Sequence, residues 1–497
     1  MTQPVETWIG SRIMIDLRSV AYILGRLLVV FGILMLVPAL VDLIFTEDQD
    51  AGAYLLSAGV TAGTGGMVVL ATRNALGRAL DFRSATLLTL GIWLLMPLFG
   101  ALPFILGAPQ LSFTDGYFEA ASGVTTTGAT VIVGLEGYPV AMNLWRGMLN
   151  WTGGLGVAFL AMIFLPVMRI GGMQFFRSEG FDTFGKVLPR ASDIARSLFQ
   201  VYAWLTVAAA ACYLAAGMTP LDAAVHAMAS ISTGGFSASD ASFGKYPGAG
   251  EYAGALFMIL GALPYVRYIE LSRGGSPRPI WRDVQVRAFL VWMAVAVMAC
   301  TLWRKAVAGG EFEDVFRDAL FNIVSIFTGT GFFSGSFASW GGFALAVAFA
   351  VGFVGGCSGS STGALSVFRV QIAAAAIGSA IRSIPFPDRL SPIRYGGRSV
   401  DMDTINGLIL FISAYVVVFG LCTVAVSFTG VDLESSIFAV WASLGNIGYG
   451  FGPLVAPTGT FIDFPETAKW ALSIAMLTGR LSLLSFLVIL LPAFWRN

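Results

Sequence analysis

The feature that most constrains this chain is a series of long apolar stretches, each long enough to cross a lipid bilayer. A membrane-crossing helix needs roughly 20 largely apolar residues, and ten stretches meet that length. Only 12% of the 497 residues are charged, against roughly 25% in soluble domains. The sequence therefore predicts an all-α polytopic membrane protein in contact with lipid. The stretches lie near 20–45, 52–72, 84–107, 141–168, 195–216, 251–271, 285–304, 338–378, 402–428 and 466–494.

Basic residues gather in alternate connections between these stretches, which predicts the orientation. Cytoplasmic connections carry an excess of Lys and Arg, so both termini are expected in the cytoplasm. Lys+Arg and Asp+Glu both total 29, so net charge gives no sign of a nucleic-acid partner. The four cysteines form no CxxC pair and predict neither a disulfide framework nor a zinc site. The basic clusters include Arg12, Arg18, Arg73, Arg78, Arg83, Arg169, Arg177, Lys186, Arg190, Arg273, Arg278, Arg282, Arg287, Arg389, Arg394, Arg398 and Arg496.

Four segments on the predicted outer side resemble one another. They read FTDGYFEAASGVTTTGAT (113–130), TPLDAAVHAMASISTGGFS (219–237), VFRDALFNIVSIFTGTGFF (315–333) and LESSIFAVWASLGNIGYG (433–450). Each begins with an apolar piece too short to span a membrane, which fits a re-entrant helix. Asp115, Asp222, Asp318 and Ser435 stand thirteen residues before the aligned glycines and are expected to cap these helices. The aligned glycines are Gly128, Gly235, Gly331 and Gly448.

Each short helix is followed by a Thr/Ser/Gly-rich run. Irregular backbone at membrane depth is tolerated only where protein or water satisfies it, and glycine permits backbone angles that turn carbonyl oxygens inward. Rings of carbonyls can replace the hydration shell of K⁺, and four loops around one axis supply enough oxygens. The repeat therefore predicts four M1–pore helix–M2 units around a central pore. The alternative is that these runs are ordinary glycine turns.

These motifs resemble those of the Trk/Ktr/HKT superfamily of K⁺ transporters, over essentially all of 84–497. Further matching motifs are WTGGLG (151–156), GGCSGSSTG (355–363), NIGYGFG (446–452) and GRLS (479–482). Two additional helices in 20–72 look like those of the Trk-type branch. The resemblance implies K⁺ as the transported ion, and a glycine at 128 favours K⁺ over Na⁺. The implied filter consists of Thr126, Thr127, Gly128, Thr233, Gly234, Gly235, Gly329, Thr330, Gly331, Asn446, Ile447 and Gly448, with K⁺ held by the backbone carbonyls of Thr126, Thr127, Thr233, Gly234, Gly329, Thr330, Asn446 and Ile447.

The eighth apolar stretch is too long for one helix. At 1.5 Å per residue, 338–378 would extend about 60 Å, twice the thickness of the bilayer core. It must break, and the Gly/Ser-rich segment 355–363 is the expected place. The resemblance implies that this segment is an intramembrane gate; the alternative is a static kink between two half-helices. The residues of this segment are Gly355, Gly356, Cys357, Ser358, Gly359, Ser360, Ser361, Thr362 and Gly363.

Arg480 lies inside the last apolar stretch. A buried intramembrane arginine is costly unless it is partnered, and it marks function by default. Its donors suit backbone carbonyls, and the resemblance implies that it faces the gate segment and the ion path. We expect Arg480 to be an electrostatic barrier and a latch for the segment. The alternative is a salt bridge with a carboxylate. The family often has Glu where this chain has Ser482, which leaves the local charge balance open.

The remaining signals concern partners and boundaries. His226, the only histidine, is expected to pack or hydrogen-bond rather than bind metal. Gly63, Gly65 and Gly66 suggest close helix packing. No P-loop is present, so no nucleotide is expected on this chain. The resemblance implies a homodimer in a bacterial inner membrane, docked by a cytosolic nucleotide-binding TrkA-like ring, with 381–400 as a candidate docking segment. Expected divisions are 1–83, with the cytoplasmic N-terminus and two extra helices, and four repeats at 84–170, 171–272, 273–380 and 381–497.

Two other functions remain open from the residues alone. A secondary transporter, coupled to H⁺ or Na⁺ or carrying Na⁺ itself, would usually have inverted repeats and midplane carboxylates. Here the repeats run parallel. An intramembrane enzyme would need a constellation of His, Asp or Glu that the sequence lacks. The leading hypothesis is therefore a non-enzymatic, channel-like K⁺ uptake protein.

Overall fold

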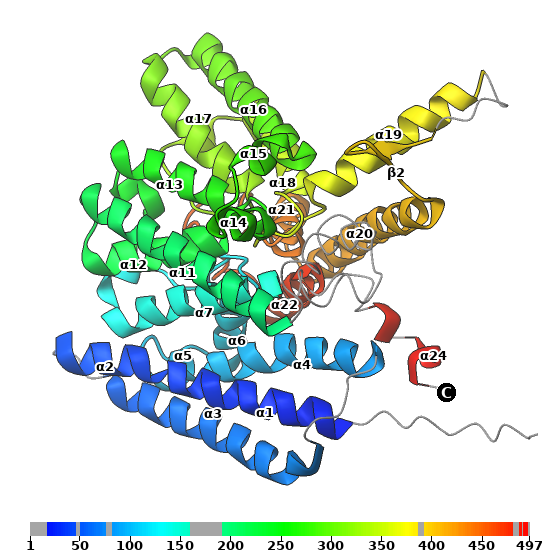
Figure 1. The fold of residues 1–497 in the computed structure, drawn as a ribbon. Coiled ribbons are helices and arrows are strands. Elements are labelled where there is room, and N and C mark those ends of the chain that lie inside the picture. The colour runs from blue at the N-terminus through cyan, green and yellow to red at the C-terminus, as the bar shows by residue number, and fades with distance from the viewer. Residues whose placement is uncertain are drawn as a thin grey trace, which may run out of the picture.

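The computed structural model is built almost entirely of α-helices (Figure 1). It describes residues 17–45, 50–75, 82–159, 191–385, 392–480, 487–489 and 491–495. Six described segments are long and apolar enough to cross a membrane, and a seventh qualifies as a bent pair. The predicted stretches 141–168 and 466–494 and the docking segment 381–400 lie partly outside the described residues. The six segments are Leu17–Phe45, Ala51–Thr72, Arg83–Leu106, Asp193–Ala215, Val284–Ala308 and Met402–Phe428.

Four successive units each contain a helix, a shorter helix and a second helix. The first comprises α4 (Phe82–Gly100) with α5 (Leu102–Leu106), α6 (Phe113–Val124) and α7 (Val140–Phe159); the second comprises α11 (Ala191–Ala215), α12 (Pro220–Ser232), α13 (Ala249–Gly261) and α14 (Tyr265–Ser272). The third comprises α16 (Val284–Ala308), α17 (Phe312–Phe327), α18 (Gly342–Val354) and α19 (Val367–Ser383); the fourth comprises α20 (Met402–Phe428), α21 (Leu433–Leu444) and α22 (Glu466–Arg480). The predicted helix–short helix–helix order is observed in all four.

The short helices α6, α12, α17 and α21 connect the units into a closed ring. Helix α12 packs against α7, α17 against α13, α21 against α18, and α6 against α22. Each pore-loop helix thus contacts the helix that follows the pore loop in the unit before it, and the first unit closes on the fourth. This cyclic packing brings the C-terminal ends of the four short helices together.

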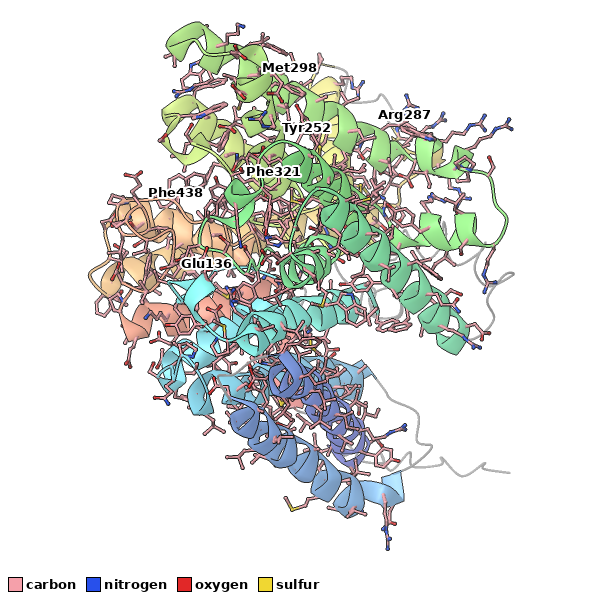
Figure 2. All side chains as sticks on the ribbon, turned by 90° about the vertical axis from the view of Figure 1, so that its left-hand side faces the viewer. Glu136, Tyr252, Arg287, Met298, Phe321 and Phe438 are labelled. Atoms are coloured by element: carbon pink, nitrogen blue, oxygen red, sulfur yellow. The ribbon has the colours of Figure 1, made fainter. Side chains whose placement is uncertain are left out.

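The remaining described elements are small. Helix α15 (Arg278–Arg282) precedes α16, α24 (Pro492–Trp495) lies near the C-terminus, and 3₁₀ turns occupy Arg73–Ala75, Leu135–Gly137, Ser242–Lys245 and Phe337–Ser339. The strands β1 (Arg394–Tyr395) and β2 (Arg398–Ser399) form an antiparallel pair within the predicted docking segment. Figure 2 places Arg287 and Glu136 toward opposite ends of the molecule.

Two predicted spans depart from straight helices. The stretch 251–271 bends by 90° between α13 and α14, where Pro264 cannot continue a helix. The eighth stretch breaks as predicted, but the helix-free segment covers 355–366 and not only 355–363. The two irregularities lie together, because the Cys357 amide donates to the Ala262 carbonyl at 3.2 Å and the Tyr265 amide donates to the Gly359 carbonyl at 3.0 Å.

The expected helix caps are corrected by the structure. The N-cap residues of α6, α12 and α21 are Ser112, Thr219 and Asp432, whose side chains accept from the amides of Asp115, Asp222 and Ser435. The three predicted caps therefore occupy the third helical position. Asp318 lies well inside α17, because this helix starts nineteen residues before its glycine and the other three start fifteen before theirs. The additional four residues make about one extra turn.

The N-terminal helices α1 (Leu17–Leu34), α2 (Leu36–Phe45) and α3 (Ala51–Thr72) lie along one side of the molecule, next to α4 (Figure 1). Glycines allow α1 and α3 to approach closely. A Cβ built on Gly65 would lie 2.6 Å from the Gly25 carbonyl oxygen and 2.8 Å from the Val29 nitrogen. Of the three glycines predicted to pack, only Gly65 does so; Cβ atoms on Gly63 and Gly66 would meet nothing within 4 Å.

Replacement of Gly65 by valine is expected to destabilise the protein, because the added atoms force α1 and α3 apart. Overpacking of this kind typically costs about 1–3 kcal/mol. Thermal unfolding of the detergent-purified protein measures the effect. The matched control, Gly66→Val, faces open space and should retain the wild-type melting temperature within about 1–2 °C. Equal melting temperatures for the two variants would contradict the assignment of the contact.

Candidate functional site

Each of the four short helices ends in the same backbone motif. In each unit, the amide of the residue two positions before the aligned glycine donates to the carbonyl of the residue five positions before that glycine. The amide of the residue just before the glycine donates to the carbonyl of the residue six positions before the glycine. This pair of bonds is a Schellman motif, whose C′ residue takes a left-handed conformation. The C′ residues are Thr126 (φ 52°), Thr233 (φ 51°), Gly329 (φ 67°) and Asn446 (φ 51°). The four loops are thus equivalent over consecutive positions despite different side chains.

The glycines that follow also have positive φ: 86° at Gly128, 74° at Gly235, 87° at Gly331 and 71° at Gly448. A Cβ on any of them would overlap a carbonyl oxygen of the next unit. The order is cyclic: Gly128 faces the Gly234 oxygen, Gly235 faces Thr330, Gly331 faces Ile447, and Gly448 faces Thr127. In every case the oxygen belongs to the residue just before the neighbouring glycine. The four predicted glycines therefore encircle one axis, and any side chain at them would break the ring.

The same four glycines line a single cavity of about 320 Å³. Its wall continues through the segments that follow them, including Phe236, Phe333 and Tyr449. Within the described residues, no three His, Cys, Asp or Glu side chains are grouped so as to hold a metal ion.

Two of the C′ residues place the backbone under strain. A left-handed conformation is a genuine outlier for a β-branched residue, and Thr126 and Thr233 both adopt it. Such strain costs on the order of 1–3 kcal/mol and persists only where the surroundings enforce it.

At the fourth C′ position the Asn446 Nδ2 donates to the Thr127 Oγ1 at 2.9 Å and to the Met476 carbonyl at 3.0 Å. This side chain links the fourth loop to the first.

The broken segment 355–366 lies directly against the ring. A Cβ on Gly363 would overlap the Gly445 carbonyl oxygen and lie 3.1 Å from the Asn446 Cβ. The Ser358 amide donates to Gln285 at 3.0 Å, and the hydroxyls of Ser361 and Tyr265 are 2.8 Å apart. All the predicted gate residues, 355–363, are in this segment, which contacts helix ends of the second, third and fourth units.

Arg480 joins this segment to the ring. Its Nε donates to the Thr125 carbonyl at 2.7 Å and its Nη2 donates to the Ser361 carbonyl at 2.7 Å. The side chain is buried, and its hydrogen-bond partners are carbonyls, as expected, and not the carboxylate of the alternative interpretation. Thr125 caps α6, so the guanidinium also lies at the negative end of a helix dipole.

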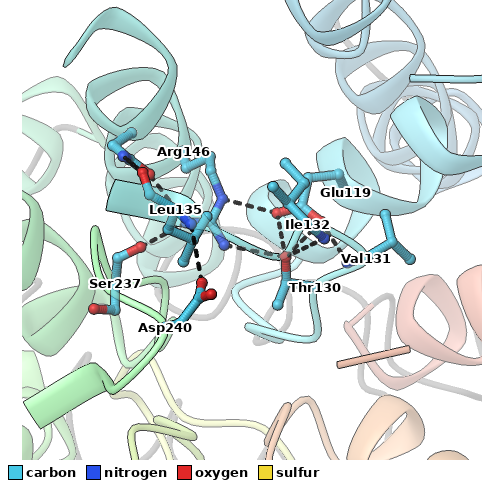
Figure 3. A network of polar contacts seen from close by, with 9 residues as sticks. Glu119, Thr130, Val131, Ile132, Leu135, Arg146, Ser237 and Asp240 are labelled. Atoms are coloured by element: carbon cyan, nitrogen blue, oxygen red, sulfur yellow. Dashed lines mark hydrogen bonds and ion pairs between the residues drawn. The ribbon is translucent and has the colours of Figure 1, made fainter. Parts of the chain in front are cut away.

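A buried ion pair beside the ring was not predicted (Figure 3). The Arg146 Nε donates to the Glu119 Oε1 at 2.8 Å, and the two side chains are 1% and 0% exposed. The sequence contained the signal, because Arg146 lies inside the fourth apolar stretch and an intramembrane cation is a functional candidate by default. Lys469 of α22, 5% exposed, likewise pairs with Asp115 at 2.6 Å. His226 packs and hydrogen-bonds, as predicted, on Asp222 and Ser237.

Acidic groups stand in the loops beyond the cavity. Glu136 accepts from the Ser239 hydroxyl at 2.5 Å and from the Asp240 amide at 3.1 Å. Partial burial raises the pKa of Glu136, but the hydrogen bonds, first that from Ser239, outweigh it, and the pKa is below its usual value. Glu136 is therefore ionised at neutral pH, and it gives this end of the cavity a negative charge.

These features define a helical membrane protein with four pore loops closed around one passage. The family model for TrkH, described as a cation transport protein, matches residues 58–496, so the chain belongs to the TrkH family. It is 36% identical to the Trk system potassium uptake protein TrkI of Halomonas elongata, over 96% of both chains. It is 35% identical to TrkH of Escherichia coli over 97% of this chain and 99% of that one.

A solved structure shares the fold. The crystal structure of the potassium transporter TrkH from Vibrio parahaemolyticus matches with a TM-score of 0.88 and 33% sequence identity. The match covers 97% of this chain and all of that chain. The N-terminal helices α1, α2 and α3 are therefore part of the shared fold together with the four units.

Replacement of Arg480 by glutamine is expected to loosen 355–366, because the variant loses the charged donors to Thr125 and Ser361. Hydrogen–deuterium exchange of peptides from this segment should become faster, while peptides from α1 and α3 remain unchanged. The matched control is Lys469→Gln. Lys469 is another buried cation of the same helix, but its partner is Asp115, which is not part of segment 355–366. Equal exchange of the segment in Arg480→Gln and wild type would contradict the linking role.

Proposed function

We propose that this protein is a channel-like K⁺ uptake pathway of a bacterial inner membrane, with both termini in the cytoplasm. The observation that carries the proposal is the cyclic contact between the four glycines and the carbonyl oxygens of the next unit. A closed ring of backbone oxygens can replace the hydration shell of K⁺. The four short helices direct their C-terminal ends toward this ring, and helix dipoles there favour a cation.

In this proposal the filter loops are 126–128, 233–235, 329–331 and 446–448. The carbonyls of Thr127, Gly234, Thr330 and Ile447 form one layer, since they are the oxygens nearest the neighbouring glycines. The C′ residues supply the candidate second layer. The names of the relatives, which describe potassium uptake, support K⁺ as the substrate. The repeat boundaries at 83, 170, 272 and 380 stay predictions; the first lies at the start of α4 and the last lies three residues before the end of α19.

Segment 355–366 is proposed as the gate and Arg480 as its latch. The segment contacts the ring through Gly363 and is tied to α6 through Arg480, so a shift of the segment changes the surroundings of the passage. Arg480 also places a positive charge that opposes a cation. The proposal also includes a homodimer and a ring-shaped cytosolic partner that binds nucleotide. This partner would contact the basic side near Arg287. Through α14 and α16 it would act on the bonds that join segment 355–366 to Tyr265 and Gln285.

Serine at Gly128 or Gly448 is expected to weaken selection of K⁺ over Na⁺, because the added atoms displace the neighbouring carbonyl. The measurement is ⁸⁶Rb⁺ uptake into a K⁺-transport-deficient bacterium, with Na⁺ as competitor. Na⁺ should compete about tenfold more effectively in the variants, a change of about 1.4 kcal/mol. Gly137→Ser is the control, because a Cβ on Gly137 meets nothing within 4 Å and its φ is ordinary. Unchanged selectivity in both filter variants would remove the assignment.

Shortening of the gate segment is expected to raise ion flux. Deletion of Ser358–Ser360 removes the bond from the Ser358 amide to Gln285 and the bond from the Tyr265 amide to the Gly359 carbonyl, while leaving Gly363 and Ser361 in the chain. ⁸⁶Rb⁺ flux into proteoliposomes of purified protein should increase. Flux equal to or below that of wild type, at equal reconstituted amounts, would count against a gate.

The second candidate is an ion-coupled symporter, with K⁺ or Na⁺ as the substrate. The same proteoliposomes separate the two. Uptake that follows the K⁺ gradient and membrane potential alone supports a channel-like pathway. Saturating uptake that requires an imposed H⁺ or Na⁺ gradient would favour coupled transport.

A further inference from the structure

In three of the four units, the residue nine positions before the filter glycine bonds to the segment that leaves the filter. The residues at this position, here called support residues, are Glu119, His226, Asn322 and Ala439, on α6, α12, α17 and α21. The exit strands are defined here as the two residues that begin two positions after each glycine: 130–131, 237–238, 333–334 and 450–451. Three of the four support residues are polar and buried.

The polar support residues bond to their own exit strand. Glu119 accepts from the Thr130 hydroxyl at 2.9 Å and from the Val131 amide at 3.0 Å. His226 Nε2 lies 3.0 Å from the Ser237 hydroxyl, while its Nδ1 donates to a carbonyl of its own helix. The Asn322 amide group donates to the Ser334 carbonyl at 2.8 Å and accepts from its amide at 3.2 Å.

The fourth unit uses the support of its neighbour. Ala439 has no polar side chain, but the Tyr449 hydroxyl, one residue after Gly448, donates to the Asn322 Oδ1 at 2.9 Å. Asn322 therefore positions the exit backbone of the third unit and a filter-flanking side chain of the fourth. The four support residues therefore occupy equivalent positions in their units but have chemically different side chains.

Only the support of the first unit carries charge, and Arg146 extends it to the second unit. Besides Glu119, Arg146 Nη1 donates to the Ser237 carbonyl at 2.5 Å and Nη2 donates to the Thr130 hydroxyl at 3.2 Å (Figure 3). Its guanidinium carbon lies 4.2 Å from the Phe236 ring centroid. Thr130 and Ser237 are the equivalent residues of two exit strands, so one cation ties both together.

A buried ion pair is weak evidence of stabilisation, because the loss of hydration offsets the attraction between the charges. The hydrogen bonds of the two side chains indicate more directly that the pair fixes the position of the exit strands. Arg146 lines the cavity and carries four polar contacts on two units, and Glu119 accepts from both a side chain and a backbone amide of the exit strand. Removal of one partner leaves a buried charge beside the filter, and the exit strands would move to solvate it.

We propose that Glu119 and Arg146 are positioning residues that fix the separation between the filter loops of the first and second units, and with it the discrimination between K⁺ and Na⁺. This inference rests on the proposed function. The carbonyls of Thr127 and Gly234 stand three residues before Thr130 and Ser237, so rigid exit strands keep these oxygens apart. Loops released from Arg146 could approach one another and accommodate the smaller ion.

The test is ⁸⁶Rb⁺ uptake in a K⁺-transport-deficient bacterium, with K⁺ and Na⁺ as competitors, at equal membrane amounts of protein. Glu119→Gln keeps a hydrogen-bond acceptor for the exit strand and removes the charge. It should shift the ratio of half-inhibitory K⁺ and Na⁺ concentrations toward Na⁺ by about tenfold. Thr130→Val, nearly isosteric and uncharged, removes the hydroxyl between the two charged groups and should shift the ratio in the same direction by a smaller factor. It keeps the proposal testable if Glu119→Gln fails to fold.

The matched control is Asp115→Asn, which breaks an ion pair with Lys469 about one turn before Glu119 on the same helix. It should retain the wild-type ratio. Reduced uptake with an unchanged ratio in both Glu119→Gln and Thr130→Val would reveal a merely structural pair and overturn the inference. A wild-type protein that fails to distinguish K⁺ from Na⁺ would overturn the proposed function instead.

Discussion

The structure depends on the close approach of each filter glycine to a carbonyl oxygen of the next unit, which belongs to the residue just before that unit's own glycine. The contact recurs four times in cyclic order and leaves no room for a side chain. The helices follow the same order, since each of α6, α12, α17 and α21 packs on the helix that follows the pore loop in the unit before it. Backbone chemistry at the centre and helix packing at the periphery therefore impose the same arrangement.

The ring of glycines and the break in the eighth apolar stretch could be predicted from the sequence because their signals are local. Alignment of four segments on Gly128, Gly235, Gly331 and Gly448 identified the ring, and the length of the eighth apolar stretch required a break. The C-terminal ends of the short helices were correctly registered, since the Schellman motif fixes them relative to the glycines. The N-terminal ends were not, because α17 has one additional turn that moves Asp318 away from its expected place.

Other features depend on contacts between distant segments, which apolar length cannot reveal. The stretch 251–271 has the length of a straight span, yet it bends at Pro264 and bonds to the broken segment of the third unit. The adjacent glycines Gly65 and Gly66 look alike in the sequence, but the rotation of α3 places only Gly65 against α1. Glu119 bonds to Thr130 and Val131, which are eleven and twelve residues further along the chain, and no periodic pattern in the sequence marks these contacts.

The four support residues can differ in chemistry because the four units are parts of one polypeptide. In an assembly of identical subunits, a substitution beside the passage enters at every corner and preserves rotational symmetry. In this single polypeptide it enters once, so an acid, an imidazole, an amide and a methyl group can occupy corresponding corners. Rigidity around the passage can thus be adjusted one quadrant at a time, with the backbone ring left intact.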